Sequence, residues 1–144
     1  MAKLLGNNYR LWIDTTTTGG TYAIIAGQQS LSMTRKANTI DTSTKDDFPY
    51  ATSAAGLFDV GVSLDGIATL PDANGFTLAE TSYKAQTTKN FQIRKGGSSG
   101  TAGDAVWTAA CNILDMSVDY GQNDSVKYKL ELGIASAPTT DALS

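Results

Sequence analysis

Histidine is absent from this chain of 144 residues, and cysteine occurs once, as Cys111. The lack of histidine excludes Ser-His-Asp triads and Cys-His dyads, and together with the single cysteine it excludes nearly every zinc site. One cysteine cannot form an internal disulfide, so a secreted scaffold held by disulfides is excluded as well. Cys111 lies in the apolar run AVWTAACNIL, which favours a small buried hydrophobic side chain. The sequence therefore predicts no metal site and no cofactor.

Long apolar runs and an excess of basic residues are also missing. No stretch has the length and hydrophobicity of a transmembrane helix, and the first ten residues lack the apolar core of a signal peptide. We therefore expect no membrane partner and synthesis in a cytoplasm. Eleven basic residues against fourteen acidic ones give a net charge of −3, and no basic patch of the kind that specific duplex-DNA binders carry is visible.

Threonine, serine and glycine are abundant and proline is rare, a mixture typical of β-strands joined by glycine turns. Alternation of apolar and polar residues is clearest over 57–68, where Phe58, Val60, Val62 and Leu64 are predicted to point inward. The last two predicted strands form a hairpin that brings Asp119 near Lys127. The predicted strands cover residues 9–14, 21–27, 28–34, 38–44, 57–68, 90–96, 105–121 and 125–135.

One helix is predicted over 76–88, with Phe76, Ala79 and Tyr83 on its buried stripe. The predicted fold is mainly β: an antiparallel β-sandwich or half-barrel with a single packed helix. The length fits one domain, which we place over residues 1–134, followed by a frayed C-terminal tail over 135–144.

One segment breaks the alternation between two predicted strands. Residues 45–56 begin with three consecutive charges, continue with an aromatic-proline-aromatic triplet and show no period. Loops of about a dozen residues are uncommon in compact domains and are usually functional. The sequence therefore predicts a functional loop, with a disordered solvent loop as the alternative. Its candidate residues are Lys45, Asp46, Asp47, Phe48, Pro49 and Tyr50.

The polar sides of the long predicted strands carry carboxylates and hydroxyls. At a rise of about 3.3 Å per residue, Asp59 and Asp65 lie about 20 Å apart and Asp115 and Asp119 about 13 Å apart. Neither separation suits an acid–base pair within one strand, and the glycine-rich segment 95–104 lacks the lysine of a phosphate loop. We expect no enzyme activity. The polar sides either face solvent on an ordinary sheet or line a water-filled channel made by several copies.

The order of the motifs resembles that of a known family. The chain opens with MAKLLGNNYRLWID, continues through AGQQSLSMTRKANTIDTSTKD, and places VSLDG on the next strand, before a short helix and a final hairpin. This arrangement resembles the major tail tube protein of long-tailed, siphovirus-like bacteriophages of the TP901-1 type. The resemblance covers residues 2 to about 134.

The resemblance implies a helix-flanked β-sandwich that assembles with itself into hexameric rings, which stack into a hollow tube. Double-stranded DNA would pass through the lumen without specific binding. The other implied partners are the tape measure, tail terminator and baseplate or distal tail proteins. The implied location is the virion tail, assembled in the cytoplasm of a host bacterium.

The resemblance also assigns roles to the candidate residues. The loop 45–56 becomes an arm between subunits or rings, in which Phe48 and Tyr50 are apolar anchors and the neighbouring charges set the register. A largely negative lumen would keep DNA sliding, because a basic one would hold its phosphates through many contacts. The candidate lumen-facing residues are Asp59, Ser63, Asp65, Asp115, Ser117 and Asp119.

A monomeric β-sandwich binding module, of adhesin or carbohydrate-recognising type, is the alternative function. Such modules often expose a platform of aromatic side chains. In this chain Trp12, Trp107, Phe48 and Tyr50 would supply it. The two functions differ in what they require of these residues, since a platform needs the tryptophans at the surface and a tube needs contacts between copies.

Overall fold

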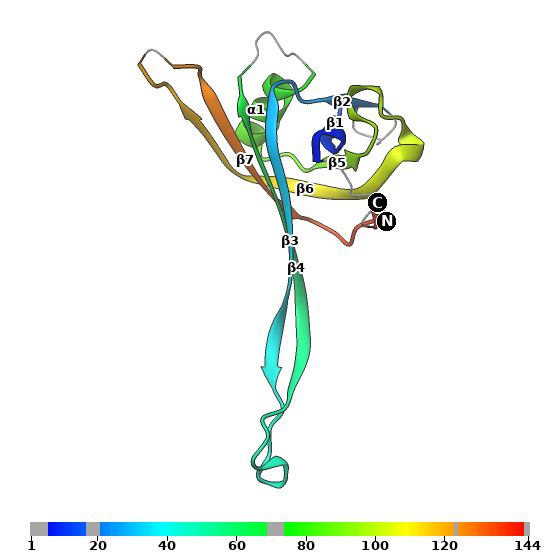
Figure 1. Ribbon diagram of the computed structural model, residues 1–144, viewed down its shortest axis with the longest axis vertical. Helices are drawn as coiled ribbons and strands as arrows, with labels where there is room; N and C mark the ends of the chain where they lie inside the picture. Colours follow the sequence, from blue (N-terminus) through cyan, green and yellow to red (C-terminus); the bar gives the residue numbers. More distant parts are fainter. Residues whose placement is uncertain (1–5, 17–20, 69–73, 123, 143–144) are drawn as a thin grey trace.

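The computed structural model describes residues 6–16, 21–68, 74–122 and 124–142, apart from the side chains of Asn7, Asp47 and Ala102. Its strands form one antiparallel sheet in the order β2-β1-β5-β6-β7-β4-β3, with β8 beside β6 (Figure 1). The strands are β1 (Arg10–Asp14), β2 (Tyr22–Ile24), β3 (Gln28–Asp41), β4 (Ser53–Ile67), β5 (Lys89–Arg94), β6 (Ala105–Asp119), β7 (Lys127–Ile134) and β8 (Thr140–Asp141). The helical segments are α1 (Phe76–Ala85) and the 3-10 turns η1 (Gly6–Asn8), η2 (Lys45–Asp47), η3 (Gly97–Ser99) and η4 (Ala102–Asp104).

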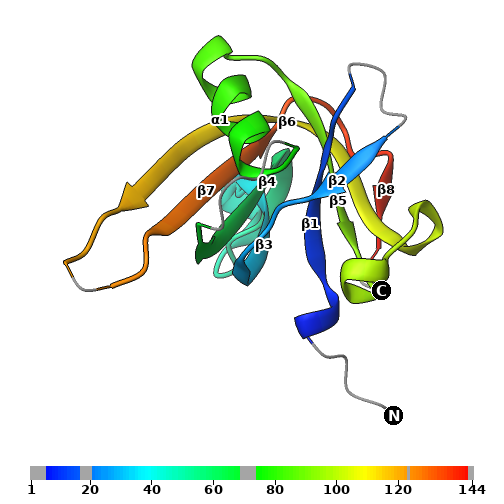
Figure 2. The same ribbon diagram turned by 90° about the horizontal axis from the view of Figure 1, so that it is seen from above.

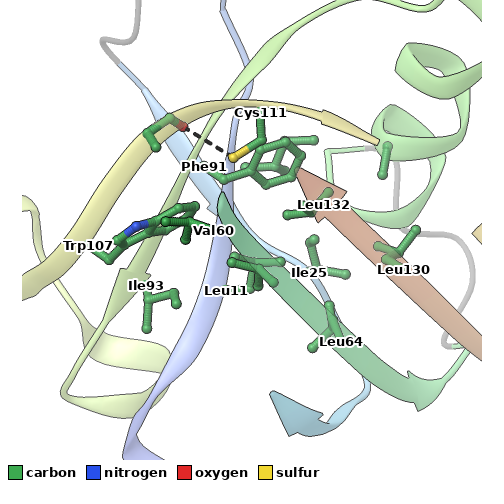
Figure 3. Packing of buried hydrophobic residues seen from close by; sticks show 14 of the residues in the cluster. Leu11, Ile25, Val60, Leu64, Phe91, Ile93, Trp107, Cys111, Leu130 and Leu132 are labelled. Atoms are coloured by element: carbon green, nitrogen blue, oxygen red, sulfur yellow. Dashed lines mark hydrogen bonds between the residues drawn. The ribbon is translucent and has the colours of Figure 1, made fainter. Parts of the chain in front are cut away.

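The long strand β6 divides the sheet into two halves. Its first half pairs with β5 and its second half with β7, so β2-β1-β5 and β7-β4-β3 lie on opposite sides of it (Figure 2). Apolar side chains of the two halves gather between them, and Figure 3 shows them packed around Leu11. Phe91 and Trp107 come from one half, and Leu64 and Leu130 from the other. The predicted mainly β, antiparallel fold with one helix is confirmed.

The helix packs against β6 and ends earlier than predicted. It stops at Ala85, where the backbone of Gln86 turns left-handed with φ of 53° and its N–H bonds to the carbonyls of Ser82 and Tyr83. The buried side chains are Phe76, Ala79 and Ser82. The prediction that Tyr83 lies on the buried stripe is wrong, since the helix turns Ser82 toward the core and leaves Tyr83 exposed.

The side chain of Gln28 joins β1 to the start of β3. Its Nε2 donates to the carbonyls of Leu11 and Ile25, each at 2.8 Å, and its Oε1 accepts from the Leu11 N–H at 2.9 Å. Where β1 and β3 approach each other, these side-chain hydrogen bonds take the place of backbone hydrogen bonds between paired strands. The alternation of the sequence carries no signal for this contact, because it is made by one polar side chain.

We expect Gln28→Ala to lower the free energy of unfolding by about 2 kcal/mol, because it removes the acceptor of the Leu11 N–H in a partly buried seam, together with the side-chain donor to the Leu11 and Ile25 carbonyls. Urea denaturation measures the change. The neighbouring exposed Gln29 is the matched position, and Gln29→Ala should change the stability by less than about 0.5 kcal/mol. Equal effects of the two substitutions would show that the seam does not depend on Gln28.

The hairpin of β3 and β4 extends far beyond the rest of the molecule (Figure 1). Strand β4 pairs with β7 only over 61–67, so residues 35–60 form a two-stranded arm. Its β3 portion, 35–41, spans about 24 Å at the rise of an antiparallel strand. A β-bulge interrupts the pairing between Ala37 and Thr39.

The predicted loop over 45–56 is wrong in its bounds, because β4 begins at Ser53. Hydrogen bonds of Ser43 and Thr52 extend the pairing past the strand ends, with the Thr52 N–H donating to Ser43 Oγ at 2.7 Å. The Ser43 N–H bonds to the Asp41 carboxylate at 2.9 Å, which lowers the pKa of that carboxyl. Alternation failed here because this ribbon packs neither face on the core, so nothing imposes a period of two on its residues.

The C-terminal segment follows β6. The N–H groups of Ala135, Thr139 and Ala142 donate to carbonyls of β6, and β8 pairs Asp141 with Trp107. Asp141 also forms an ion pair with Arg35 at the base of the arm. The described part of the segment is therefore packed on the sheet, which differs from the frayed end that the sequence predicts. A domain boundary after residue 134 stays a prediction.

Candidate functional site

The arm carries most of the large apolar side chains that the described residues expose. Nine such side chains are exposed, and five lie on the arm, where no other part of the chain covers them. Phe48 and Tyr50 at its tip are 86% and 78% exposed. Apolar surface gathered in this way is typical of a protein interface. The other three are Ile40, Leu57 and Phe58.

The inward orientation predicted for Phe58 is wrong. The inner side of β4 is buried at Val60, Val62 and Leu64, but Phe58 lies beyond the core on the arm and is 74% exposed. Its cross-strand neighbour is Ala37, which is too small to cover it. Alternation could not predict this, since it identifies the side of a strand and not the point where the core ends.

The tip of the arm brings the predicted loop residues together, as far from the body as the chain reaches (Figure 1). Lys45 and Asp46 lie in η2, exposed and without an ion pair within the described chain, and the side chain of Asp47 lies outside that part. Phe48 follows, and its peptide bond to Pro49 is cis. Pro49 and Tyr50 are also exposed, so the tip presents two aromatic side chains beside charged ones.

A second surface is the polar side of β3, β4, β7 and β6. Cross-strand partners share a face, and the register places Ser63 opposite Glu131, which in turn lies opposite Asp115. In the next row Asp65 lies opposite Lys129, and Lys129 opposite Ser117. The structure therefore gathers five predicted lumen-facing residues on one face: Ser63, Asp65, Asp115, Ser117 and Asp119. The sixth, Asp59, lies on the arm opposite Lys36.

This polar face is mixed in charge, with an acidic excess. Four carboxylates, those of Asp65, Asp115, Asp119 and Glu131, stand against two lysines, Lys127 and Lys129. Lys129 pairs with Glu131 at 3.5 Å. The predicted approach of Asp119 to Lys127 is confirmed by the register, but the ion pair of Lys127 is with Asp124 in the adjoining turn, at 3.5 Å. The Ser125 N–H and then the Lys127 charge lower the pKa of Asp124.

Both outer strands of this four-stranded unit have a free edge. Strand β3 has β4 as its strand neighbour from Ser30 to Asp41, and β6 pairs with β7 alone beyond Cys111, as far as the described residues show. Unpaired edges are templates for joining another chain. Sequence patterns predicted the strands but not these edges, because strand order depends on contacts between residues far apart in the chain.

The tryptophans do not form an aromatic platform. Trp107 is fully buried in the core, and Trp12 is 8% exposed. The guanidinium of Arg94 lies over the Trp12 ring, 4.6 Å from its centre, and also over the Tyr22 ring, 5.3 Å from its centre. Burial lowers the pKa of Arg94. Of the four residues predicted to form an aromatic platform, only Phe48 and Tyr50 on the arm are therefore exposed.

The described residues offer little for other chemistry. Within these ranges no helix is long and apolar enough to cross a membrane. The same ranges contain no group of three or more histidine, cysteine or acidic residues placed to hold a metal ion. Cys111 is buried, as the sequence predicts, and desolvation raises the pKa of its thiol to about 12.

Comparisons with known proteins give the family. A search of curated proteins finds no match. Among solved structures, the chain resembles the tail of an empty gene transfer agent particle refined with C6 symmetry, at a TM-score of 0.77 and 17% identity, covering 97% of this chain and 100% of that one. It also resembles the SPP1 tail tube, at a TM-score of 0.76 and 10% identity, covering 98% of this chain and 81% of that one. At these identities the likeness shows a shared fold.

The family model for phage tail tube proteins matches residues 5–140, which is nearly the whole chain. The match includes the arm, the polar face and both free edges. Members of this family are structural components of tail tubes, in agreement with the resemblance that the sequence motifs indicate. The chain belongs to the phage tail tube protein family and is a structural protein, not an enzyme.

Proposed function

We propose that the chain forms hexameric rings that stack into a hollow tube, through which double-stranded DNA passes. The observation that carries this proposal is a four-stranded polar sheet with a free edge on each side. Family membership supplies the context, and the related gene transfer agent tail was refined with six-fold symmetry.

The ring would close through the strand edges. Strands β3, β4, β7 and β6 are antiparallel in turn, so β3 and β6 run in opposite directions. A neighbour's β3 laid beside β6 would therefore be antiparallel to it, and the alternation would continue around the ring. An exposed edge strand has unpaired backbone N–H and C=O groups that can join other chains. Closing a sheet on itself removes every free edge and pairs these groups.

The polar face of this sheet would line the bore. Asp65, Asp115, Ser117 and Asp119 are exposed in the isolated chain and Ser63 is half-buried. The opposite face of the sheet is the core, so the polar face is free to meet water. Four carboxylates against two lysines give each subunit an acidic excess there. Duplex DNA carries a phosphate charge about every 1.7 Å, and an acidic wall repels it, so DNA would slide without specific binding.

The arm would join successive rings. Phe48 and Tyr50 are the apolar anchors, and the charges of Lys45, Asp46 and Asp47 would fix the register between rings. The arm of one copy would contact a different surface on the next copy, and a heterologous contact of this kind can repeat without closing, which builds an open stack. The stack would be assembled in the host cytoplasm and would meet the tape measure, tail terminator and baseplate or distal tail proteins in the virion.

Electron microscopy and sedimentation of the purified chain test this proposal. We expect rings and tubes of uniform diameter that grow longer as protein concentration rises, because stacking follows mass action. Six-fold class averages of the rings would support the hexamer. A chain that stays monomeric at every concentration, with its outer strands intact by circular dichroism, would contradict it.

A further inference from the structure

The exposed apolar side chains of the molecule fall into two groups at opposite ends. Five of the nine belong to the arm, and three others, Tyr83, Tyr120 and Val126, lie around one groove between α1 and the turn of the β6–β7 hairpin. The ninth, Leu114, already lies over Gly133 on the neighbouring strand. The surface thus offers an apolar projection at one end and an apolar groove at the other.

We infer that the arm tip of one copy docks in this groove of a copy in the next ring. This inference rests on the proposed function, since it needs copies that stack. Figure 1 shows the arm pointing away from the end that carries α1 and the β6–β7 turn. Projection and groove at opposite ends meet when copies lie head to tail, and such a contact repeats without closing.

The groove suits aromatic side chains. It has a volume of about 580 Å³ and is lined by Phe76, Tyr83, Met116, Val118, Tyr120 and Val126. Phe76 packs on Tyr128 with 5.1 Å between the ring centres, which gives the groove an aromatic wall next to the core. Phe48 and Tyr50 of the incoming arm would add further aromatic pairs, whose geometry contributes beyond the buried area.

The rim of the groove carries charges that match those of the arm. Lys84 and Glu80 form an ion pair at 2.7 Å on the exposed side of α1, and both line the groove. Lys45 and Asp46 reach the tip beside the aromatic residues without ion pairs of their own in the described chain. Each of the four charges then has an opposite partner in the docked state, which favours one register over others.

Three other large grooves do not meet these requirements. The one at the end of α1 is lined mainly by polar residues, including Thr87 and Asn112. The one lined by Arg35, Phe58 and Pro138 lies at the base of the arm, so the arm of a copy stacked head to tail cannot reach it. The one beside the start of β3 is lined mainly by polar groups, including Arg10 and Gln28. The groove at α1 is therefore the receptor that the geometry selects for the arm.

Cross-linking between engineered cysteines tests the inference. Tyr50→Cys and Val126→Cys are combined in one chain, and assembled samples are oxidised. The native Cys111 does not compete, because it is buried and its thiol pKa is about 12. We expect a ladder of covalent oligomers on non-reducing gels. The matched control pairs Tyr50→Cys with Ser98→Cys, an exposed position on η3 in the other half of the sheet, and should give at least ten-fold less product.

Microscopy of the same samples separates the two possible failures. If tubes form but give no cross-linked oligomers, the docking site is wrong and the proposed function stands. The same holds if the two double-cysteine variants give equal amounts of cross-linked oligomers. Absence of any assembly in the parent chain would overturn both. If the cysteine variants fail to fold, Val126→Asp serves instead: we expect rings that do not stack, and tubes of normal length would refute the assignment.

Discussion

A chain in which Asn-Gly replaces residues 37–58 is expected to fold and to form rings, but not to build tubes. Lys36 and Asp59 face each other across the hairpin, so a two-residue turn can join β3 to β4 at that point. The core residues of both strands lie on the body side of this junction and keep their contacts. The removed part contains all five exposed apolar side chains of the arm.

Sedimentation and electron microscopy measure the outcome, and urea denaturation should place the stability within about 1 kcal/mol of the parent chain.

A smaller change tests the same point: we expect Phe48→Ser with Tyr50→Ser to raise the concentration needed for stacking by more than about 30-fold, since interface anchors each contribute about 2 kcal/mol or more. The paired control, Lys45→Ala with Asp46→Ala, should shift it by less than about ten-fold. Tubes of normal length without the arm would refute its role.

The second large effect concerns the bore. With Asp65, Asp115 and Asp119 all replaced by lysine, particles are expected to assemble tails but to lose DNA delivery by several orders of magnitude. The three carboxylates lie on one face of adjoining strands, and the substitution makes the charge of that face strongly positive. Each ring would then hold many phosphates at once, and many weak contacts together stall a sliding polymer.

Infectivity or gene-transfer titre, alongside counts of intact tails by microscopy, measures this effect. Asparagine at the same three positions is the matched control, because it keeps the side-chain size and removes the charge without reversing it. We expect that variant to retain most of its titre. A lysine variant with intact tails and normal delivery would mean that these residues do not face the DNA.

Sequence patterns predicted the parts of the fold that are packed against a core. Alternation identified Val62 and Leu64 on β4 and Leu130 and Leu132 on β7, because burial on one side of a strand imposes that period. It also predicted the polar face that carries Asp65 and Ser117. The same signal placed the β6–β7 hairpin in its register.

The parts of the fold that could not be predicted leave no periodic pattern of apolar residues in the sequence. Beyond Val60 the arm packs neither side on the core, so the start of β4 from Ser53 was predicted as a loop and Phe58 as a core residue. The seam at Gln28 depends on one amide, and the contact of the C-terminal segment with β6 depends on backbone groups that every residue carries. The arm's candidate residues were identified by the loss of alternation and by their charged and aromatic side chains, and their separation from the body required the structure.

A helical reconstruction of the assembled chain tests the account most directly, because it shows at once which surface each copy presents to the axis. The account predicts a closed cylinder in which β3 of each subunit borders β6 of its neighbour, with Asp65, Asp115 and Asp119 facing the bore. It also predicts that each arm reaches the next ring. A map with the polar face turned outward, or with the edges of β3 and β6 left open, would contradict it.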